Sequence, residues 1–106
     1  MTLNVSFKHM DSSDALRAYA QEKSERLSKY FRGRITVSWN FTIEKQLRVA
    51  HCHLLGKSVD YFAHSSTEDF YASIDDTVEK IERQLRKHKE IVKDHLHRQG
   101  RRVRAA

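Results

Sequence analysis

One stretch near the middle of the chain decides the fold: ITVSWNFTI, residues 35–43. Five apolar side chains in it alternate strictly with polar ones: Ile35, Val37, Trp39, Phe41 and Ile43. This period of two is typical of a strand with one buried face. Two further strand-like stretches follow at 47–55 and 59–65, after short turns at 44–46 and 56–58. Three strands joined this closely predict an antiparallel meander.

The residues before this stretch predict a strand and then a helix. Residues 2–7 alternate in the same way, and Ser13 is a suitable N-cap for a helix that ends near Phe31. Gly33 can end this helix in the left-handed conformation that glycine adopts at little cost. The apolar positions of the helix recur at helical spacing: Leu16, Tyr19, Ala20, Leu27, Tyr30 and Phe31.

A long helix is predicted after the last strand. Ser66 and Asp69 match a capping box that would open it, and Leu96 lies near its end. Its apolar stripe recurs at alternating spacings of four and three: Ile74, Val78, Ile81, Leu85, His88 and Val92. Such spacing is also seen in coiled coils, but the stripe covers fewer than four heptads, which favours packing of this helix on the sheet.

These elements predict an α+β fold in the order β-α-β-β-β-α. Each amphipathic element needs a partner for its apolar side, so we expect a four-stranded sheet with two helices packed on one face. A chain of 106 residues suits one domain, which we assign to residues 1–96. Residues 97–106 lack apolar spacing and are expected to form a short, flexible, basic tail. With both apolar helix faces covered by the sheet, the free protein is expected to be monomeric.

Several classes of function are disfavoured by the sequence. No stretch approaches the about 18 apolar residues of a membrane span, and the start lacks a signal sequence, so we expect a cytoplasmic protein without membrane contact. His51 and His53 share a strand face but have no evident further ligands, and Cys52 is the lone cysteine. Asp75 and Asp76 point to different sides of a helix. We therefore expect no enzyme, metal, cofactor or small-molecule substrate.

The positive charge of the chain is concentrated at its C-terminal end. The formal net charge is +6, and residues 80–106 carry ten basic and three acidic side chains. The residues before position 80 have a slight excess of acidic side chains. Clustered positive charge favours a polyanionic partner, with nucleic acid as the leading candidate.

Helical geometry sorts these bases into two groups. At about 100° per residue, three of them lie opposite the apolar stripe and form one basic ridge: Lys80, Arg83 and Lys87. Arg86 and Lys93 form a flank, with Lys89 nearer the packed edge. Basic residues near a helix C-terminus also gain energy from the helix dipole, so a merely solvated face is the alternative interpretation. The basic run continues beyond the helix, which favours binding.

Two residues outside the last helix are further candidates for nucleic-acid contact. Lys23 lies on the apolar face of the first helix, where it either extends to water along packed methylenes or contacts a phosphate between the two helices. Phe62 falls on the opposite strand face from Tyr61 and Ala63 and could stack on a base, whereas Trp39 is expected in the core. The candidate RNA-binding residues are Lys23, Lys80, Arg83, Arg86, Lys87, Lys89 and Lys93.

The last helix resembles a known signature. DFYASID at residues 69–75, Lys80, and RQLRKHK at 83–89 are similar to the motif of the ribosome hibernation promoting factor and ribosome-associated inhibitor A family. Leu16 with Tyr19, and the opening Leu3-Asn4-Val5, match as well, so the resemblance covers residues 2 to about 95. The absence of a second domain after Gly100 and the short tail are similar to the short form of the family.

The resemblance implies a function that composition alone does not. Members of this family bind the small ribosomal subunit between head and platform, in the messenger and transfer RNA channel, inhibit translation, and promote ribosome hibernation under stress or in stationary phase. By resemblance, six bases would face ribosomal RNA: Lys23, Lys80, Arg83, Arg86, Lys87 and Lys89.

A double-stranded RNA-binding module is the alternative class, because it also packs two helices on one sheet face. Its phosphate-binding lysines gather at the start of its last helix. Here that start carries acidic side chains that would repel a duplex: Glu68, Asp69, Asp75 and Asp76.

Overall fold

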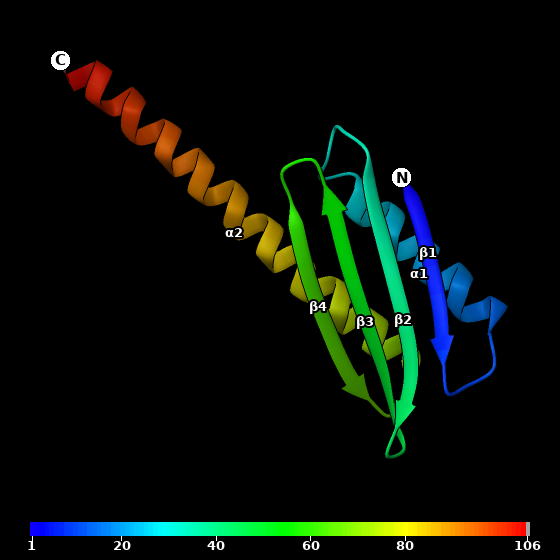
Figure 1. Cartoon of the computed structure of the whole chain (residues 1–106). Helices are drawn as coiled ribbons and strands as arrows, with labels where there is room; N and C mark the ends of the chain where they lie inside the picture. The colour runs from blue at the N-terminus through cyan, green and yellow to red at the C-terminus, as the bar shows by residue number, and fades with distance from the viewer. Residues whose placement is uncertain (106) are drawn as a thin grey trace.

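The computed structural model describes the backbone of residues 1–105 and the side chains of residues 1–87. The chain folds in the order β-α-β-β-β-α, as predicted (Figure 1). Its elements are β1 (Thr2–Lys8), α1 (Asp14–Ser28), β2 (Ile35–Glu44), β3 (Leu47–Gly56), β4 (Asp60–Thr67) and α2 (Phe70–Ala105).

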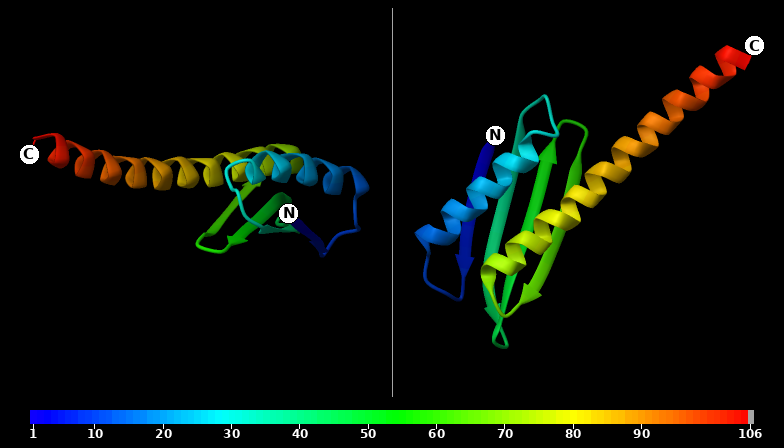
Figure 2. Two further views of the ribbon diagram at one scale, coloured as in Figure 1. Left: turned by 90° about the horizontal axis from the view of Figure 1, so that it is seen from above. Right: turned by 180° about the vertical axis from the view of Figure 1, so that it is seen from behind.

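The four strands form one sheet in the order β1-β2-β3-β4. β1 runs parallel to β2, because α1 carries the chain back between them, and the other neighbours are antiparallel. Both helices cover the same face of the sheet (Figure 2), and α2 continues well past its edge. The opposite face of the sheet is left open, and the structure confirms the predicted α+β fold.

The core lies between the sheet and the helices. Buried apolar side chains from both layers fill it, among them Leu27, Trp39, Phe41, Ile74 and Ile81. Trp39 is in the core, as predicted, and its indole Nε1 donates a hydrogen bond to Ser24 Oγ at 2.8 Å. Ser24 Oγ in turn donates to the carbonyl of Ala20 at 2.7 Å, so this buried polar pair is satisfied.

The first helix begins as predicted and ends earlier. Ser13 Oγ accepts a hydrogen bond from the Leu16 amide at 3.2 Å. The helix ends at Ser28, not near Phe31, and Gly33 has no positive φ. The amides of Tyr30 and Phe31 bond to carbonyls three residues back, which closes the helix with right-handed turns and removes the need for a left-handed glycine.

The capping box predicted at the start of the second helix is wrong. Ser66 belongs to β4, where it pairs with Val49 of β3. Asp69 is the cap, because its Oδ1 accepts from the Tyr71 amide at 3.1 Å, and Thr67 Oγ1 accepts from the Asp69 amide at 3.0 Å. The ladder with β3 extends β4 to Thr67, so the helix cannot begin at Ser66.

The second helix also ends later than its pattern indicated. It was predicted to end near Leu96, and it continues through Gly100 to Ala105. A single glycine costs a helix only about 1 kcal/mol, and arginine is a good helix former. The boundary at residues 96 and 97 and the flexibility of the tail stay predictions. His88 and Val92, at the end of the stripe, have side chains outside the described residues.

The turn between β2 and β3 gives a test of stability. Lys45 and Gln46 both have positive φ, at 49° and 69°, the geometry that Asn-Gly adopts at the least cost. The double change Lys45→Asn and Gln46→Gly should therefore raise the free energy of unfolding by about 1 kcal/mol. Urea denaturation measures it. The same dipeptide at Lys57 and Ser58, which have no positive φ, is the control and should give no gain.

Candidate nucleic-acid interface

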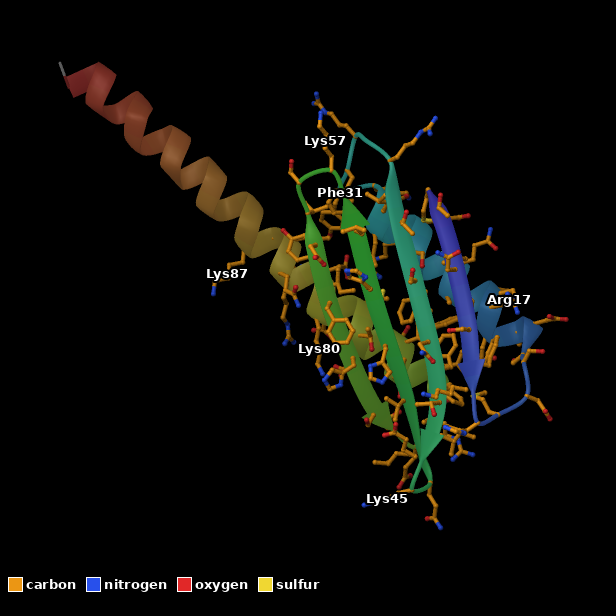
Figure 3. All side chains as sticks on the ribbon, viewed as in Figure 1. Arg17, Phe31, Lys45, Lys57, Lys80 and Lys87 are labelled. Atoms are coloured by element: carbon orange, nitrogen blue, oxygen red, sulfur yellow. The ribbon has the colours of Figure 1, made fainter. Side chains whose placement is uncertain are left out.

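The basic ridge of Lys80, Arg83 and Lys87 lies on the side of α2 that passes over β4. Arg83 and Lys87 are exposed, and Lys80 is partly exposed along the sheet. Figure 3 shows Lys80 and Lys87 on the β4 side of the molecule. The predicted helical phase is confirmed, because the apolar side chains of α2 are buried on the opposite side.

Two bases of the ridge are held by carboxylates one turn earlier in the helix. Lys80 Nζ lies 3.3 Å from Asp76 Oδ2, and Arg83 Nη2 lies 2.9 Å from Glu79 Oε1. Exposed ion pairs of this kind stabilise a protein by only about 0.2–1 kcal/mol. They orient the bases and can be exchanged for phosphate contacts at little cost.

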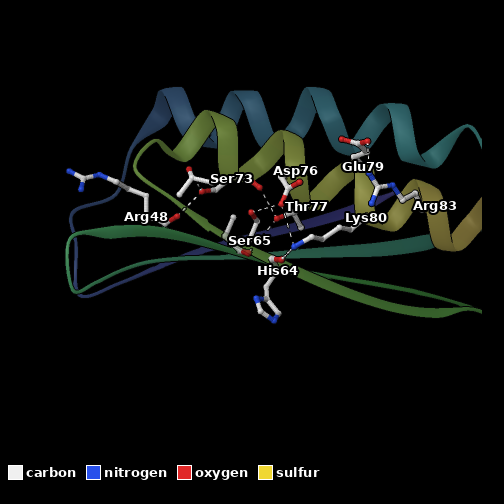
Figure 4. A network of polar contacts seen from close by, with 11 residues as sticks. Arg48, His64, Ser65, Ser73, Asp76, Thr77, Glu79, Lys80 and Arg83 are labelled. Atoms are coloured by element: carbon white, nitrogen blue, oxygen red, sulfur yellow. Dashed lines mark hydrogen bonds and ion pairs between the residues drawn. The ribbon is translucent and has the colours of Figure 1, made fainter.

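Lys80 is also fixed to the sheet (Figure 4). Its Nζ donates to the His64 carbonyl at 2.8 Å, while Asp76 Oδ2 accepts from Ser65 Oγ at 2.6 Å. The Ser65 hydrogen bond, together with the charges of Lys80 and Arg83, holds the pKa of Asp76 below its ordinary value. One end of the ridge is therefore positioned by β4 and not by α2 alone.

This network predicts an acid-sensitive contribution to stability. The folded state lowers the pKa of Asp76, so its contribution is present above the ordinary carboxyl pKa and is lost as the pH falls through the folded value. Asp76→Asn should therefore be less stable than the parent at pH 7, and the gap should narrow at pH 3. Urea denaturation at both pH values measures it. Ser65→Ala keeps the carboxylate but removes the hydrogen bond, and should lose part of the same pH dependence.

Arg86 does not join the ridge but lines a hollow between α1 and α2. This interhelical hollow has a volume of about 370 Å³. Three bases and three carboxylates line it around Val78: Lys23, Arg26 and Arg86, with Asp75, Glu79 and Glu82. The two helices thus bring Lys23 and Arg86 to one surface, as the position of Lys23 on the first helix suggested.

Lys23 packs its stem as the first of its two interpretations expected, and its contact with a phosphate stays a prediction. Its side chain is 22% exposed, and its Nζ lies 5.2 Å from the centre of the Tyr19 ring and 3.8 Å from Asp75 Oδ1. The Tyr19 hydroxyl donates to the same oxygen at 2.6 Å, and this hydrogen bond raises the pKa of Tyr19 to about 12. The stem of Lys23 packs while its ammonium reaches the interhelical hollow.

A buried carboxylate that the sequence did not reveal joins the two helices. Glu82 is 5% exposed and accepts two hydrogen bonds from Arg26, at 2.8 and 3.2 Å, and a third from the Tyr30 hydroxyl at 2.9 Å. Its buried charge is therefore paired and hydrogen-bonded. In the sequence Glu82 appeared only as one of the few acids among the C-terminal bases.

Five of the seven candidate residues are therefore placed by the structure: Lys23, Lys80, Arg83, Arg86 and Lys87. Three of them, all on α2, form the basic ridge, and the other two, Lys23 of α1 and Arg86 of α2, line the interhelical hollow. The side chains of Lys89 and Lys93 lie outside the described residues. Contact of all seven with RNA stays a prediction.

The part of the chain that the structure describes offers little for catalysis. Within it, no group of three His, Cys, Asp or Glu side chains could hold a metal ion. Burial raises the pKa of the Cys52 thiol, which disfavours the reactive thiolate. No helix among these residues is long and apolar enough to span a bilayer. The exposed bases are instead suited to binding phosphate groups.

Residues 3–93 match the family described as Sigma 54 modulation protein / S30EA ribosomal protein, and the chain belongs to this family. It is 38% identical over 90 residues to the ribosome hibernation promoting factor of Azotobacter vinelandii, covering 85% of this chain and 84% of that protein. It is 30% identical over 95 residues to the factor of Escherichia coli K12, covering 90% of this chain and all of that protein. These relatives confirm the predicted resemblance.

Two solved structures share the fold. The N-terminal domain of Thermus thermophilus Protein Y superposes with a TM-score of 0.77 at 21% identity, covering 83% of this chain and 99% of that one. A ribosomal subunit interface protein from Coxiella burnetii superposes with a TM-score of 0.74 at 22% identity, and the match covers 85% of this chain and 99% of that one. The family match and the named relatives, and not the shared fold, show that the chain is a ribosome-associated protein of a family of hibernation factors, which are not enzymes.

Proposed function

We propose that this protein binds the small ribosomal subunit in the messenger and transfer RNA channel, inhibits translation, and promotes ribosome hibernation under stress or in stationary phase. The observation that carries the proposal is the exposed basic ridge of Lys80, Arg83 and Lys87, one end of which is fixed to the sheet through His64. Its target is supported by relatives named ribosome hibernation promoting factor.

The mechanism that these residues support is electrostatic and steric. Ribosomal RNA phosphates would replace the weak carboxylate partners of Lys80 and Arg83 and would release condensed counterions. Lys23 and Arg86 would add contacts from the interhelical hollow, and Lys89 and Lys93 would extend the surface along α2. The bound domain would then occupy the space that messenger and transfer RNA need.

The proposal also assigns roles to the parts of the chain. Residues 1–96 form the ribosome-binding domain, and residues 97–106 form a short, flexible, basic tail. The protein acts in the cytoplasm and is monomeric when free. Analytical ultracentrifugation at micromolar concentration should give the mass of one chain.

Sedimentation with purified ribosomal subunits tests the proposal. The protein should travel with small subunits through a sucrose gradient, compete with transfer RNA for them, and inhibit translation in a purified extract. A free RNA duplex of matched length should compete weakly, because acidic side chains flank the first turn of α2 on both sides: Glu68 and Asp69 before it, and Asp75 and Asp76 after it. Sedimentation with large subunits alone, or undiminished transfer RNA binding at saturating protein, would contradict the proposal.

A further inference from the structure

The open face of the sheet carries a patch of polar and aromatic side chains, three of them histidines. Strand register places these residues in two neighbouring rows across β2, β3 and β4, with Ser38, His53 and Phe62 in one row and Asn40, His51 and His64 in the next. The helices cover the other face, so this patch takes no part in the core.

Phe62 is the unusual member of this patch. It is 54% exposed near the start of β4, although its side chain is large and apolar. Its ring centre lies 6.1 Å from that of His51 and 6.0 Å from that of His64, and the two histidine rings are 5.5 Å apart. Three rings therefore cluster on a surface open to solvent.

A hollow of about 390 Å³ lies beside this ring cluster, and its lining includes Phe62, His51, His53, Ser38 and Asn40. The ring of Phe62 offers a face for stacking, and the polar side chains offer donors and acceptors. An unpaired nucleobase presents both a π-face and hydrogen-bonding edges. A base in a duplex is already stacked and paired, so it cannot use this hollow.

The basic ridge borders the ring cluster directly. Lys80 Nζ bonds to the His64 carbonyl at 2.8 Å, and Gln84 Nε2 bonds to the Phe62 carbonyl at 3.2 Å. A second hollow of about 440 Å³ at this edge is lined by Phe62, Ala63, His64, Lys80, Arg83 and Gln84. Among the described residues no carboxylate lines either of these two hollows, whereas three line the interhelical hollow. Asp60 Oδ1 lies 2.6 Å from Nε2 of His53, so this imidazole already has one polar partner. Cations and rings thus form one surface around β4 that complements a nucleotide.

We infer that this surface binds an unpaired RNA nucleotide, with its base stacked on Phe62 and its phosphate at Lys80 and Arg83. The inference rests on the proposed function and deepens it, because it assigns the β4 edge to single-stranded RNA. Phe62 contributes stacking to the binding free energy, and the ridge contributes charge. The stacking contribution therefore responds to removal of the ring, and the charge contribution responds to salt.

Binding of a single-stranded RNA octamer with 2-aminopurine at its centre tests the inference on the full chain. The parent should quench the 2-aminopurine fluorescence and should bind the octamer more tightly than a duplex of equal charge. Phe62→Leu keeps an apolar side chain but removes the ring, and should abolish the quenching and weaken binding about tenfold. Its salt dependence should be unchanged, because no phosphate contact is lost. Phe62→Tyr should bind like the parent.

Leu55→Ala is the matched control, because Leu55 is another exposed apolar residue on the same sheet face, opposite Asp60. It should bind and quench like the parent. If Phe62→Leu binds within twofold of the parent with quenching intact, or if Leu55→Ala weakens binding equally, the inference is wrong. Sedimentation of the parent with small subunits is measured separately. If the parent does not sediment with them, the proposed function is wrong, whatever the octamer experiment gives.

Discussion

Changing Lys80, Arg83 and Lys87 together to glutamate is expected to abolish binding to small ribosomal subunits while leaving the fold almost intact. The three side chains are exposed or partly exposed, and the two ion pairs lost with them are surface pairs worth about 0.2–1 kcal/mol each. Three positive charges would become negative, a change of six units, on the surface that we propose faces phosphate. The affinity should fall at least about 100-fold, and inhibition of translation should disappear with it.

Salt dependence and a charge-matched control separate a specific site from general attraction. The glutamine versions of the three residues should flatten the slope of affinity against salt by about one unit per phosphate contact removed. Lys29, Lys45 and Lys57 are exposed at other places on the molecule, and their triple change to glutamate alters the net charge equally. This control should retain most of the binding. An equal loss in both triple variants would show that the ridge is only a solvated face.

The strands were predicted well because alternation with a period of two repeats over many consecutive residues, so the pattern does not depend on any single one. The pattern of residues 35–43 already separates the buried Trp39 from the exposed Asn40, and register then follows from short turns. Helix ends were predicted less well, since several local hydrogen-bonding arrangements can close a helix. Gly33 matched the usual signal for a helix end, but backbone hydrogen bonds of Tyr30 and Phe31 end α1 before it. Ser66 matched the usual signal for a helix start, but Asp69 caps α2 instead.

The sequence predicted which side of α2 carries the basic ridge. It did not predict the contacts that side chains of α2 make with other elements. A step of 100° per residue placed Lys80, Arg83 and Lys87 on one side of α2. The pair of Arg26 and Glu82 joins residues 56 positions apart, which no local pattern reveals. The sequence placed Arg86 on a flank apart from the ridge, and the structure adds that Arg86 lines the interhelical hollow with residues of α1.

Truncation of Leu85 is expected to produce the largest loss of stability among these changes. Leu85 is 6% exposed and belongs to the core between α2 and the sheet. Leu85→Ala should lower the free energy of unfolding by about 2–5 kcal/mol, the usual range for a buried leucine, and the melting temperature by about 10 °C or more. A circular-dichroism melt measures it. Lys87→Ala, two residues away and exposed, should melt close to the parent.

The same variant distinguishes packing on the sheet from a coiled coil, the alternative that the heptad-like stripe left open. If Leu85 packs only within one chain, the melting temperature of parent and variant should be independent of protein concentration. A stripe that joined two chains would instead give a melting temperature that rises with protein concentration, because the stability of a dimer depends on the concentration of its chains. A variant that melts within a degree of the parent would show that Leu85 is exposed and that the helical phase, with the basic ridge defined by it, is assigned wrongly.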